Sequence, residues 1–214
     1  MERLDLTYDY VWRYADQDKH YINLRDTAME VYGSIPQGQT ISNRGGYHSI
    51  NLKEDARLEF LIRMIEEKAK IVGDEIELVD QIELKIMNIW FNINFTNTFN
   101  VFHKHVDAPA YDRLINPCLL TGAYYVNVPD NSGNILFHQS REEPNKDKTE
   151  PSILHIPEIF LKNIQNPMLN PVRSISPKDG DLLIWMADIM HAVEPNNSED
   201  LRISISFNLG AFLK

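Results

Sequence analysis

After residue 75 the chain alternates apolar and polar residues in short runs, and this period of two limits the fold more than any other feature. Ile82, Leu84 and Ile86 alternate in one phase, whereas the apolar residues from Ile89 to Phe95 alternate in the other. The slip near Met87 and Asn88 predicts either a bulge or a break between two strands. Further strand-like runs lie at 119–128, 134–138, 153–156, 172–176, 182–186 and 202–209. Because turn residues separate these short strands, we expect a mainly β fold, built as a β sandwich or jelly roll.

The first 75 residues show a helical period instead. A short helix is predicted at 23–32 and a longer one at 52–72, where apolar residues recur at helical spacing. Asn51 and Glu54 have the spacing of a capping box before the longer helix, and Gly73 is suited to end it. One face of this helix is apolar, so we expect N-terminal helices that pack on the β-sheet as a support layer.

No internal repeat, low-complexity tract or flexible linker divides the 214 residues. The composition, with 43% hydrophobic and 24% charged residues, is that of a globular domain with a sizeable core. We therefore predict a single domain over 1–214, with 1–75 as the helical layer and 76–214 as the β core. The charged stretch 141–152 predicts an exposed loop, and 157–164 predicts a short helical turn.

The charge balance narrows the choice of partners. The chain has 31 acidic and 21 basic residues, a net charge of −10, which disfavours a nucleic-acid partner. No apolar run reaches the length of about 18 residues that a membrane span needs, and the N-terminus lacks a signal-peptide pattern. We therefore expect no membrane contact and a cytoplasmic location. The single Cys118 cannot form an internal disulfide, which agrees with a reducing compartment.

His103, His105 and Asp107 occupy alternate positions of one segment. In a strand, alternate side chains share a face, so these three potential metal ligands would lie together. Burying three such groups costs free energy unless they bind something. His191, which follows the apolar run 182–186, is the candidate ligand from elsewhere in the fold. Two imidazoles and one carboxylate on one side of an ion form the facial triad of non-haem Fe(II) oxygenases.

The last predicted strand alternates without interruption. Its polar residues Arg202, Ser204, Ser206 and Asn208 share one face, and its apolar residues share the other. The polar face predicts a wet pocket or a polar ligand, and a solvent-exposed face is the alternative. Arg202 follows His191 at a spacing that fits the next strand of a hairpin, where its guanidinium is suited to bind a carboxylate.

Short motifs surround these residues in a fixed order. They are Arg44-Gly45-Gly46-Tyr47, His105-Val106-Asp107, Gly122 to Val126, Gly133 to Phe137, Pro177-x-x-Gly180-Asp181-Leu182, His191-x-Val193-x-Pro195 and Arg202 to Asn208. Together they resemble the prolyl-hydroxylase-like branch of the 2-oxoglutarate- and Fe(II)-dependent dioxygenases. They are most similar to the uncharacterised oxygenases common in marine phages and bacteria. The ordered set is much more specific than any one motif.

The resemblance implies a double-stranded β-helix core of the jelly-roll or cupin-like kind. It implies an Fe(II)-dependent enzyme with 2-oxoglutarate and O2 as co-substrates, which hydroxylates a substrate and releases succinate and CO2. By the same resemblance, His105, Asp107 and His191 hold the metal, and Arg202 binds the distal (C5) carboxylate of 2-oxoglutarate. These four are the catalytic residues that it implies.

Further residues take supporting roles by this resemblance. Ser204 and Tyr125 assist Arg202 in binding 2-oxoglutarate, and Asn208, Asn92 and Asn94 line the same pocket. The expected substrate is a protein side chain or a small molecule. The protein would be located in the host cytoplasm if a phage carries its gene.

Two alternatives stay open at this stage. The chain offers a second pair of ligands, His103 with His105, in which case Asp107 would lie outside the metal shell. The pair His105 and Asp107 is favoured because a hard carboxylate suits Fe(II). The alternative to an enzyme is a jelly-roll binding or structural protein with a structural metal, but such a protein has no need of Arg202 beside the site.

Overall fold

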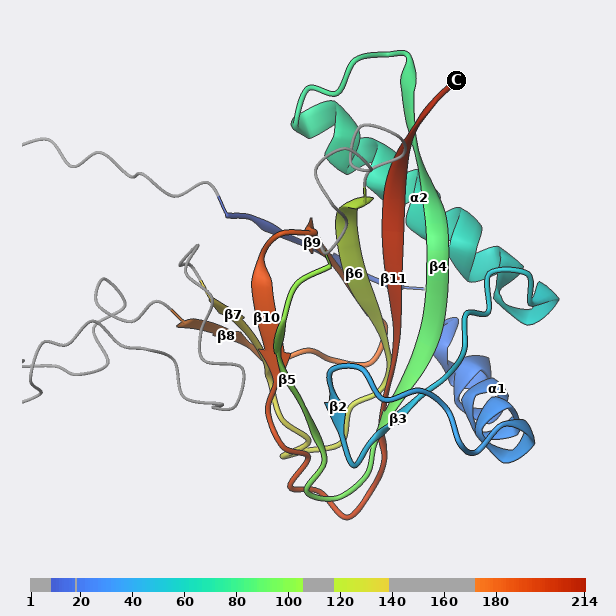
Figure 1. Ribbon diagram of the computed structural model, residues 1–214, viewed down its shortest axis with the longest axis vertical. Helices are drawn as coiled ribbons and strands as arrows, with labels where there is room; N and C mark the ends of the chain where they lie inside the picture. The colour runs from blue at the N-terminus through green and yellow to red at the C-terminus, as the bar shows by residue number, and fades with distance from the viewer. Residues whose placement is uncertain (1–8, 18, 106–117, 139–171) are drawn as a thin grey trace, which may run out of the picture.

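The computed structural model describes residues 9–17, 19–105, 118–138 and 172–214, which form two antiparallel β-sheets (Figure 1). The six-stranded sheet has the strand order β1-β9-β6-β11-β4-β3, and the five-stranded sheet has the order β2-β5-β10-β7-β8. This jelly-roll arrangement confirms the predicted mainly β fold class with N-terminal helices.

The larger sheet is made of β1 (Val11–Ala15), β3 (Tyr47–His48), β4 (Ile82–Asn94), β6 (Cys118–Asn127), β9 (Asp181–Met186) and β11 (Arg202–Leu213). The smaller sheet is made of β2 (Asn43–Arg44), β5 (Phe99–His103), β7 (Ile135–His138), β8 (Val172–Ile175) and β10 (Met190–Val193). The helical elements among the described residues are α1 (Tyr21–Ser34), the short 3₁₀ helix η1 (Ala56–Leu58) and α2 (Glu59–Glu75). None of these helices is long and apolar enough to cross a membrane.

Strand β11 is the centre of the larger sheet, because it pairs with β4 on one side and with β6 on the other. Its pairing with β4 runs from Arg202 opposite Asn94 to the end of both strands. The register shifts between Asn208, opposite Asn88, and the next residue, opposite Ile86, so Met87 is the extra residue of a bulge. The predicted phase slip is therefore a bulge within one strand.

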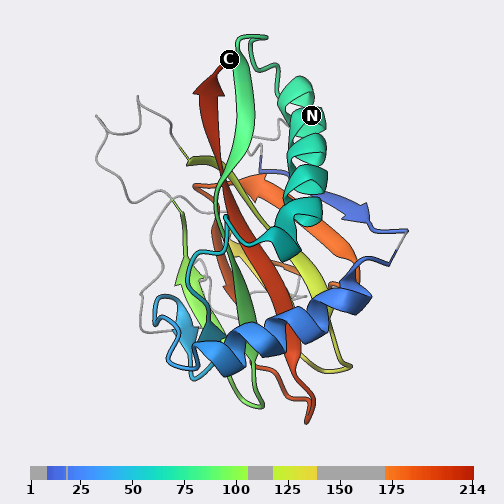
Figure 2. The same ribbon diagram turned by 90° about the vertical axis from the view of Figure 1, so that its right-hand side faces the viewer.

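Both helices lie across the outer face of the larger sheet (Figure 2). The apolar stripe of α2, which includes Leu61 and Ile65, belongs to the same buried cluster as Ile203, Ile205 and Phe207 of β11. Burial of such side chains contributes roughly 1.5–3 kcal/mol each to folding, an upper estimate because unfolded chains are partly compact. The expected helical support layer is confirmed. The single-domain division of 1–214 stays a prediction.

The longer helix begins later and ends later than its sequence pattern predicts. Asn51 Oδ1 accepts from the backbone N–H of Lys53 and also from that of Ile89 in β4, at 3.1 Å in each case. This side chain therefore connects the turn to the sheet, and η1 intervenes before α2 begins at Glu59. Gly73 lies inside α2, and Glu77, with φ of 58°, is the left-handed residue that follows the helix.

Strand β1 was not expected from the helical pattern of residues 1–75. It pairs antiparallel with β9 at the edge of the larger sheet.

Other predictions fall on segments that the structure does not describe. These are the strand at 153–156, the exposed loop at 141–152 and the helical turns at 157–164.

Gly122 of β6 lies opposite Phe207 of β11, and this pairing leaves no room for a side chain at Gly122. A Cβ at this position would lie 2.2 Å from the Phe207 ring and 2.4 Å from the carbonyl oxygen of Leu183. We expect Gly122→Ala to lower the free energy of unfolding by about 1–3 kcal/mol, because the packed core has to shift. Urea unfolding measures this value, and Gly33→Ala is the control, since nothing lies within 4 Å of a Cβ there. Equal stability of the two variants would contradict the packing argument.

Candidate active site

A cavity of about 310 Å³ lies between the two sheets. Its walls are the inner faces of β4, β6 and β11, the ends of β5 and β10, and the segment 39–51. The polar row predicted for β11 faces this cavity, whereas the apolar row of the same strand packs against the helices. The exposed-face alternative for the polar row is therefore wrong.

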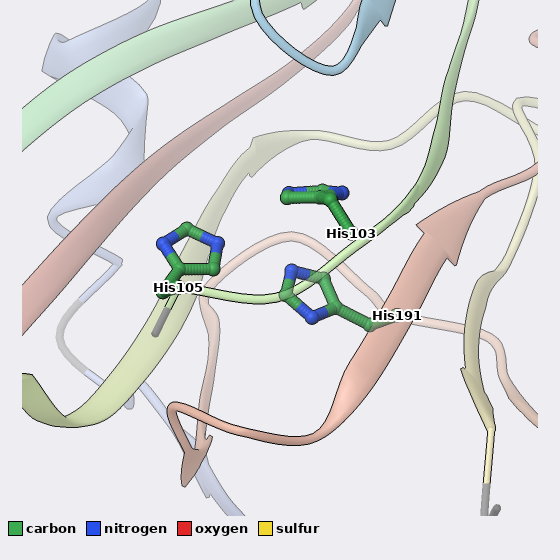
Figure 3. A group of neighbouring side chains, drawn as sticks. All are labelled: His103, His105 and His191. Carbon is green, nitrogen blue, oxygen red and sulfur yellow. The ribbon is translucent and has the colours of Figure 1, made fainter. Parts of the chain in front are cut away.

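Three histidines meet at one wall of the cavity (Figure 3). His103 is the last residue of β5, and it lies opposite His191 of β10 in the strand pairing. His105 follows two residues later, where its backbone N–H donates to the carbonyl of Ala187 at 2.9 Å. One ring nitrogen from each histidine lies within 4.8 Å of the others, so the three can share one metal ion.

Backbone carbonyls set the tautomer of two of these rings. Nδ1 of His103 lies 2.8 Å from the carbonyl oxygen of Val101, and Nδ1 of His191 lies 3.0 Å from that of Ile189. A carbonyl only accepts, so each Nδ1 carries the proton and each Nε2 carries the lone pair. This is the outer hydrogen bond that orients a metal-ligating histidine.

His105 is held differently, by ring stacking. Its ring stacks on Trp90, with centroids 5.9 Å apart and planes at 19°, and on His191, at 5.1 Å and 15°. Trp90 in turn stacks on His48 at 5.1 Å and 13°. Trp90 thus stacks on both His48 and His105, and it acts as a support for the His105 ring.

Two of the histidines, His105 and His191, are neutral at physiological pH. Burial, reinforced by neighbouring His103, lowers the pKa of His105 to about 3. Burial, with His103 and His105 adding to it, lowers the pKa of His191 well below its ordinary value. A neutral imidazole is the form that binds a metal, so these two histidines do not have to lose a proton first. The donor set fits Fe(II), for which imidazole is a suitable ligand.

Arg202 lies at the start of β11 and is only 1% exposed. Its Nη1 donates to Asn94 Oδ1 at 3.3 Å, and its guanidinium lies 5.2 Å from the centre of the Tyr125 ring. Nε and Nη2 have no hydrogen-bond partner among the described residues. Burial lowers the pKa of Arg202 and the Tyr125 contact partly offsets this, yet a guanidinium stays cationic in proteins.

A buried cation of this kind costs several kcal/mol unless an anion accompanies it. No carboxylate of the described residues forms an ion pair with Arg202. Two unpartnered donors on one side of a guanidinium match the two oxygens of a carboxylate. The arrangement therefore fits the distal carboxylate of 2-oxoglutarate.

The structure places nearly all of the predicted site residues on this cavity. Ser204, Tyr125, Asn92 and Asn208 line it, and Asn92 Nδ2 donates to Ser206 Oγ at 2.8 Å. His105, His191 and Arg202 also line the cavity, whereas Asn94 is bonded to Arg202 but is not one of the lining residues. Asp107, the predicted carboxylate ligand, lies outside the described residues.

Some cavity residues were not found from the sequence. His48 of β3 and Trp90 of β4 support the His105 ring, and Gln39 and Ser42 contribute to the wall from the segment 39–51. The Arg44-Gly45-Gly46-Tyr47 motif was a signal that this segment belongs to the site. Its individual lining residues have no periodic pattern that could have identified them.

The sequence matches the family described as "Putative 2OG-Fe(II) oxygenase" over residues 88–208, which is more than half of the chain. The chain belongs to this family of 2-oxoglutarate- and Fe(II)-dependent oxygenases. It is an enzyme of this class, with Fe(II) as cofactor and 2-oxoglutarate and O2 as co-substrates. The non-catalytic alternative is therefore wrong. No curated protein matches the sequence significantly.

Solved structures with the same fold share little sequence with this chain. A prolyl-4-hydroxylase of Pseudomonas putida is 11% identical, with a TM-score of 0.62 over 94% of this chain and 91% of its own. The viral collagen prolyl hydroxylase of Paramecium bursaria Chlorella virus-1 is 12% identical, with a TM-score of 0.58 over 94% and 96%. HygX of Streptomyces hygroscopicus, solved with nickel, 2-oxoglutarate and hygromycin B, is 11% identical, with a TM-score of 0.55 over 95% and 83%.

The stacked position of Trp90 generates a prediction about metal binding. We expect Trp90→Leu to weaken Fe(II) binding about tenfold, because outer partners of a metal ligand typically contribute 10–100-fold to affinity. Anaerobic titration of the metal-free protein with Fe(II) measures this. Trp12→Leu is the matched control, since Trp12 donates to Glu75 on the other side of the sheet. Equal affinities in the two variants would rule out the supporting role.

Proposed function

We propose that this enzyme is a hydroxylase that acts on a protein side chain or a small molecule. The observation that carries the proposal is that three converging histidines and a buried arginine, which has no counter-ion among the described residues, line one cavity. Iron and 2-oxoglutarate, when bound, supply the oxidising chemistry, in which 2-oxoglutarate and O2 yield succinate and CO2 as a substrate C–H bond is hydroxylated. The protein's own residues hold, orient and shield these groups.

We propose His103, His105 and His191 as the residues that hold Fe(II). Their ring nitrogens converge within 4.8 Å, and two of them present Nε2 because Nδ1 is bonded to a carbonyl. The sequence favoured Asp107 over His103, and that prediction stays untested. His105 and His191 are common to both ligand sets, so the identity of the third ligand is the point to decide.

The third ligand is decided by comparing two variants. We expect His103→Ala to lower Fe(II) affinity by more than the 10–100-fold typical of an outer partner, and to abolish succinate formation. Asp107→Ala should keep most of the Fe(II) affinity and most of the succinate formation. His20→Ala, on the outer side of the protein, is the matched histidine control. Loss of metal binding in Asp107→Ala, with retention in His103→Ala, would instead establish the carboxylate triad.

For 2-oxoglutarate we propose Arg202 as the anchor of the C5 carboxylate, assisted by Tyr125 and Ser204. The guanidinium of Arg202 lies over the Tyr125 ring, and Ser204 is the next residue of β11 that faces the cavity. The buried carboxylate and guanidinium would then neutralise each other, which offsets the cost of burying the cation.

A hydrogen bond to a charged group contributes roughly 1.5–3 kcal/mol, which corresponds to about ten- to a hundredfold in affinity. We expect Arg202→Ala to raise the concentration of 2-oxoglutarate needed for half-maximal turnover at least about tenfold, while Fe(II) affinity stays unchanged. Arg25→Ala, an exposed arginine variant, should match the wild type. An unaltered 2-oxoglutarate titration in Arg202→Ala would contradict the anchoring role.

The proposed substrate classes rest on two considerations. The structures with this fold include prolyl hydroxylases and an enzyme with hygromycin B bound. The net charge of −10 disfavours nucleic acid, because phosphate contacts need clustered basic residues. A cytoplasmic location and a phage origin stay predictions.

A further inference from the structure

Four buried polar side chains, three of which line the cavity, form a series of hydrogen bonds that starts at Arg202 and crosses from the larger sheet to the smaller one. Arg202 Nη1 donates to Asn94 Oδ1 at 3.3 Å, and Asn94 Nδ2 donates to Asn100 Oδ1 at 3.2 Å. Asn100 Nδ2 then donates to Ser42 Oγ at 3.2 Å. The four residues are 1%, 1%, 6% and 7% exposed along the chain, so water competes little for these bonds.

Each bond in this chain fixes the direction of the next. A guanidinium only donates, so Asn94 has to present Oδ1 to Arg202 and turn Nδ2 the other way. That Nδ2 then needs an acceptor, which Asn100 Oδ1 provides, and Nδ2 of Asn100 needs one in turn, which the hydroxyl of Ser42 provides. This series of hydrogen bonds begins on β11 and β4 of the larger sheet. It ends at β5 and the residue before β2 of the smaller sheet. Both sheets thus determine how the Arg202 side chain is held.

The same contacts leave one edge of the guanidinium for a ligand. Nη1 is engaged by Asn94, and the guanidinium carbon lies over the Tyr125 ring, 5.2 Å from its centre. The two nitrogens without partners, Nε and Nη2, are neighbours on the edge opposite Nη1. This edge is one of those that bind a carboxylate with two parallel hydrogen bonds.

We propose that Asn94 and Asn100 are positioning residues, which hold Arg202 by Nη1 so that its Nε–Nη2 edge receives the carboxylate of 2-oxoglutarate. This inference rests on the proposed role of Arg202 as the anchor. Asn94 has to be an amide for this purpose. An aspartate there would pair with Arg202 itself and compete with the carboxylate of the co-substrate, whereas an apolar residue would leave Nη1 unpartnered.

Asn94→Asp is the sharpest test, because it changes the charge and the donor but hardly the shape. We expect the KM for 2-oxoglutarate to rise at least about tenfold, with kcat at saturating 2-oxoglutarate near that of the wild type. Asn100→Ala removes the acceptor that orients Asn94, and we expect a smaller rise in KM, about two- to tenfold. Anaerobic titration of the Fe(II)-loaded protein with 2-oxoglutarate should show the same order in its dissociation constants.

The matched control is Asn127→Ala. Asn127 Nδ2 donates to the carbonyl of Leu201, the residue before Arg202, at 2.5 Å, but it does not touch the chain of four side chains. This variant should lose some thermal stability and keep the wild-type KM for 2-oxoglutarate. A matching rise in KM in Asn127→Ala would mean that any loosening of β11 has this effect, and it would overturn the positioning role.

The inference and the proposed function fail in different ways. If Arg202→Ala itself leaves 2-oxoglutarate binding unchanged, the anchoring role is wrong and the positioning role is wrong with it. If Arg202→Ala raises the KM but Asn94→Asp stays within twofold of the wild type, the positioning role alone is wrong. Should Asn94→Asp fail to fold, Asn100→Ala decides the matter by the same criterion.

Discussion

The rest of the structure depends on the position of β11 between two different environments. Ile203, Ile205 and Phe207 point into the apolar layer under the helices, whereas Arg202 and Ser204 point into the cavity. Because strand side chains alternate with a period of two, a shift of one residue against β4 would exchange the two sets. The hydrogen bonds that pair β11 with β4 and β6 therefore stabilise the core and place the site at once.

The interior of the jelly roll contains groups that are unfavourable in a protein core. Burial keeps His105 and His191 neutral, which leaves their lone pairs for a metal, and it leaves Arg202 without a counter-ion among the described residues. Such groups reduce the stability of the protein without its ligands. A cation at the histidines and a carboxylate at Arg202 each remove part of this cost, so ligand binding and folding stability are coupled.

Much of the architecture follows from local patterns that the sequence displays. The alternation of β11, the phase slip near Met87 and the apolar stripe of α2 were all predictable, because each depends on residues close together in the chain. The beginning of α2 was not, because Asn51 accepts a hydrogen bond from Ile89 on a strand far along the sequence. Strand β1 was missed for a similar reason, since its pairing partner is the distant β9.

The sequence by itself determined the fold class, the polar face of β11 and the histidine and arginine types needed for an oxygenase. Tertiary structure decided which of these side chains meet. It brought His103 opposite His191, stacked Trp90 beneath His105, and connected Arg202 to Asn94. These contacts join residues on different strands, and their partners are set by strand register and sheet closure. A local sequence pattern specifies which face of a strand a side chain occupies. It does not specify which side chain of another strand will lie next to it.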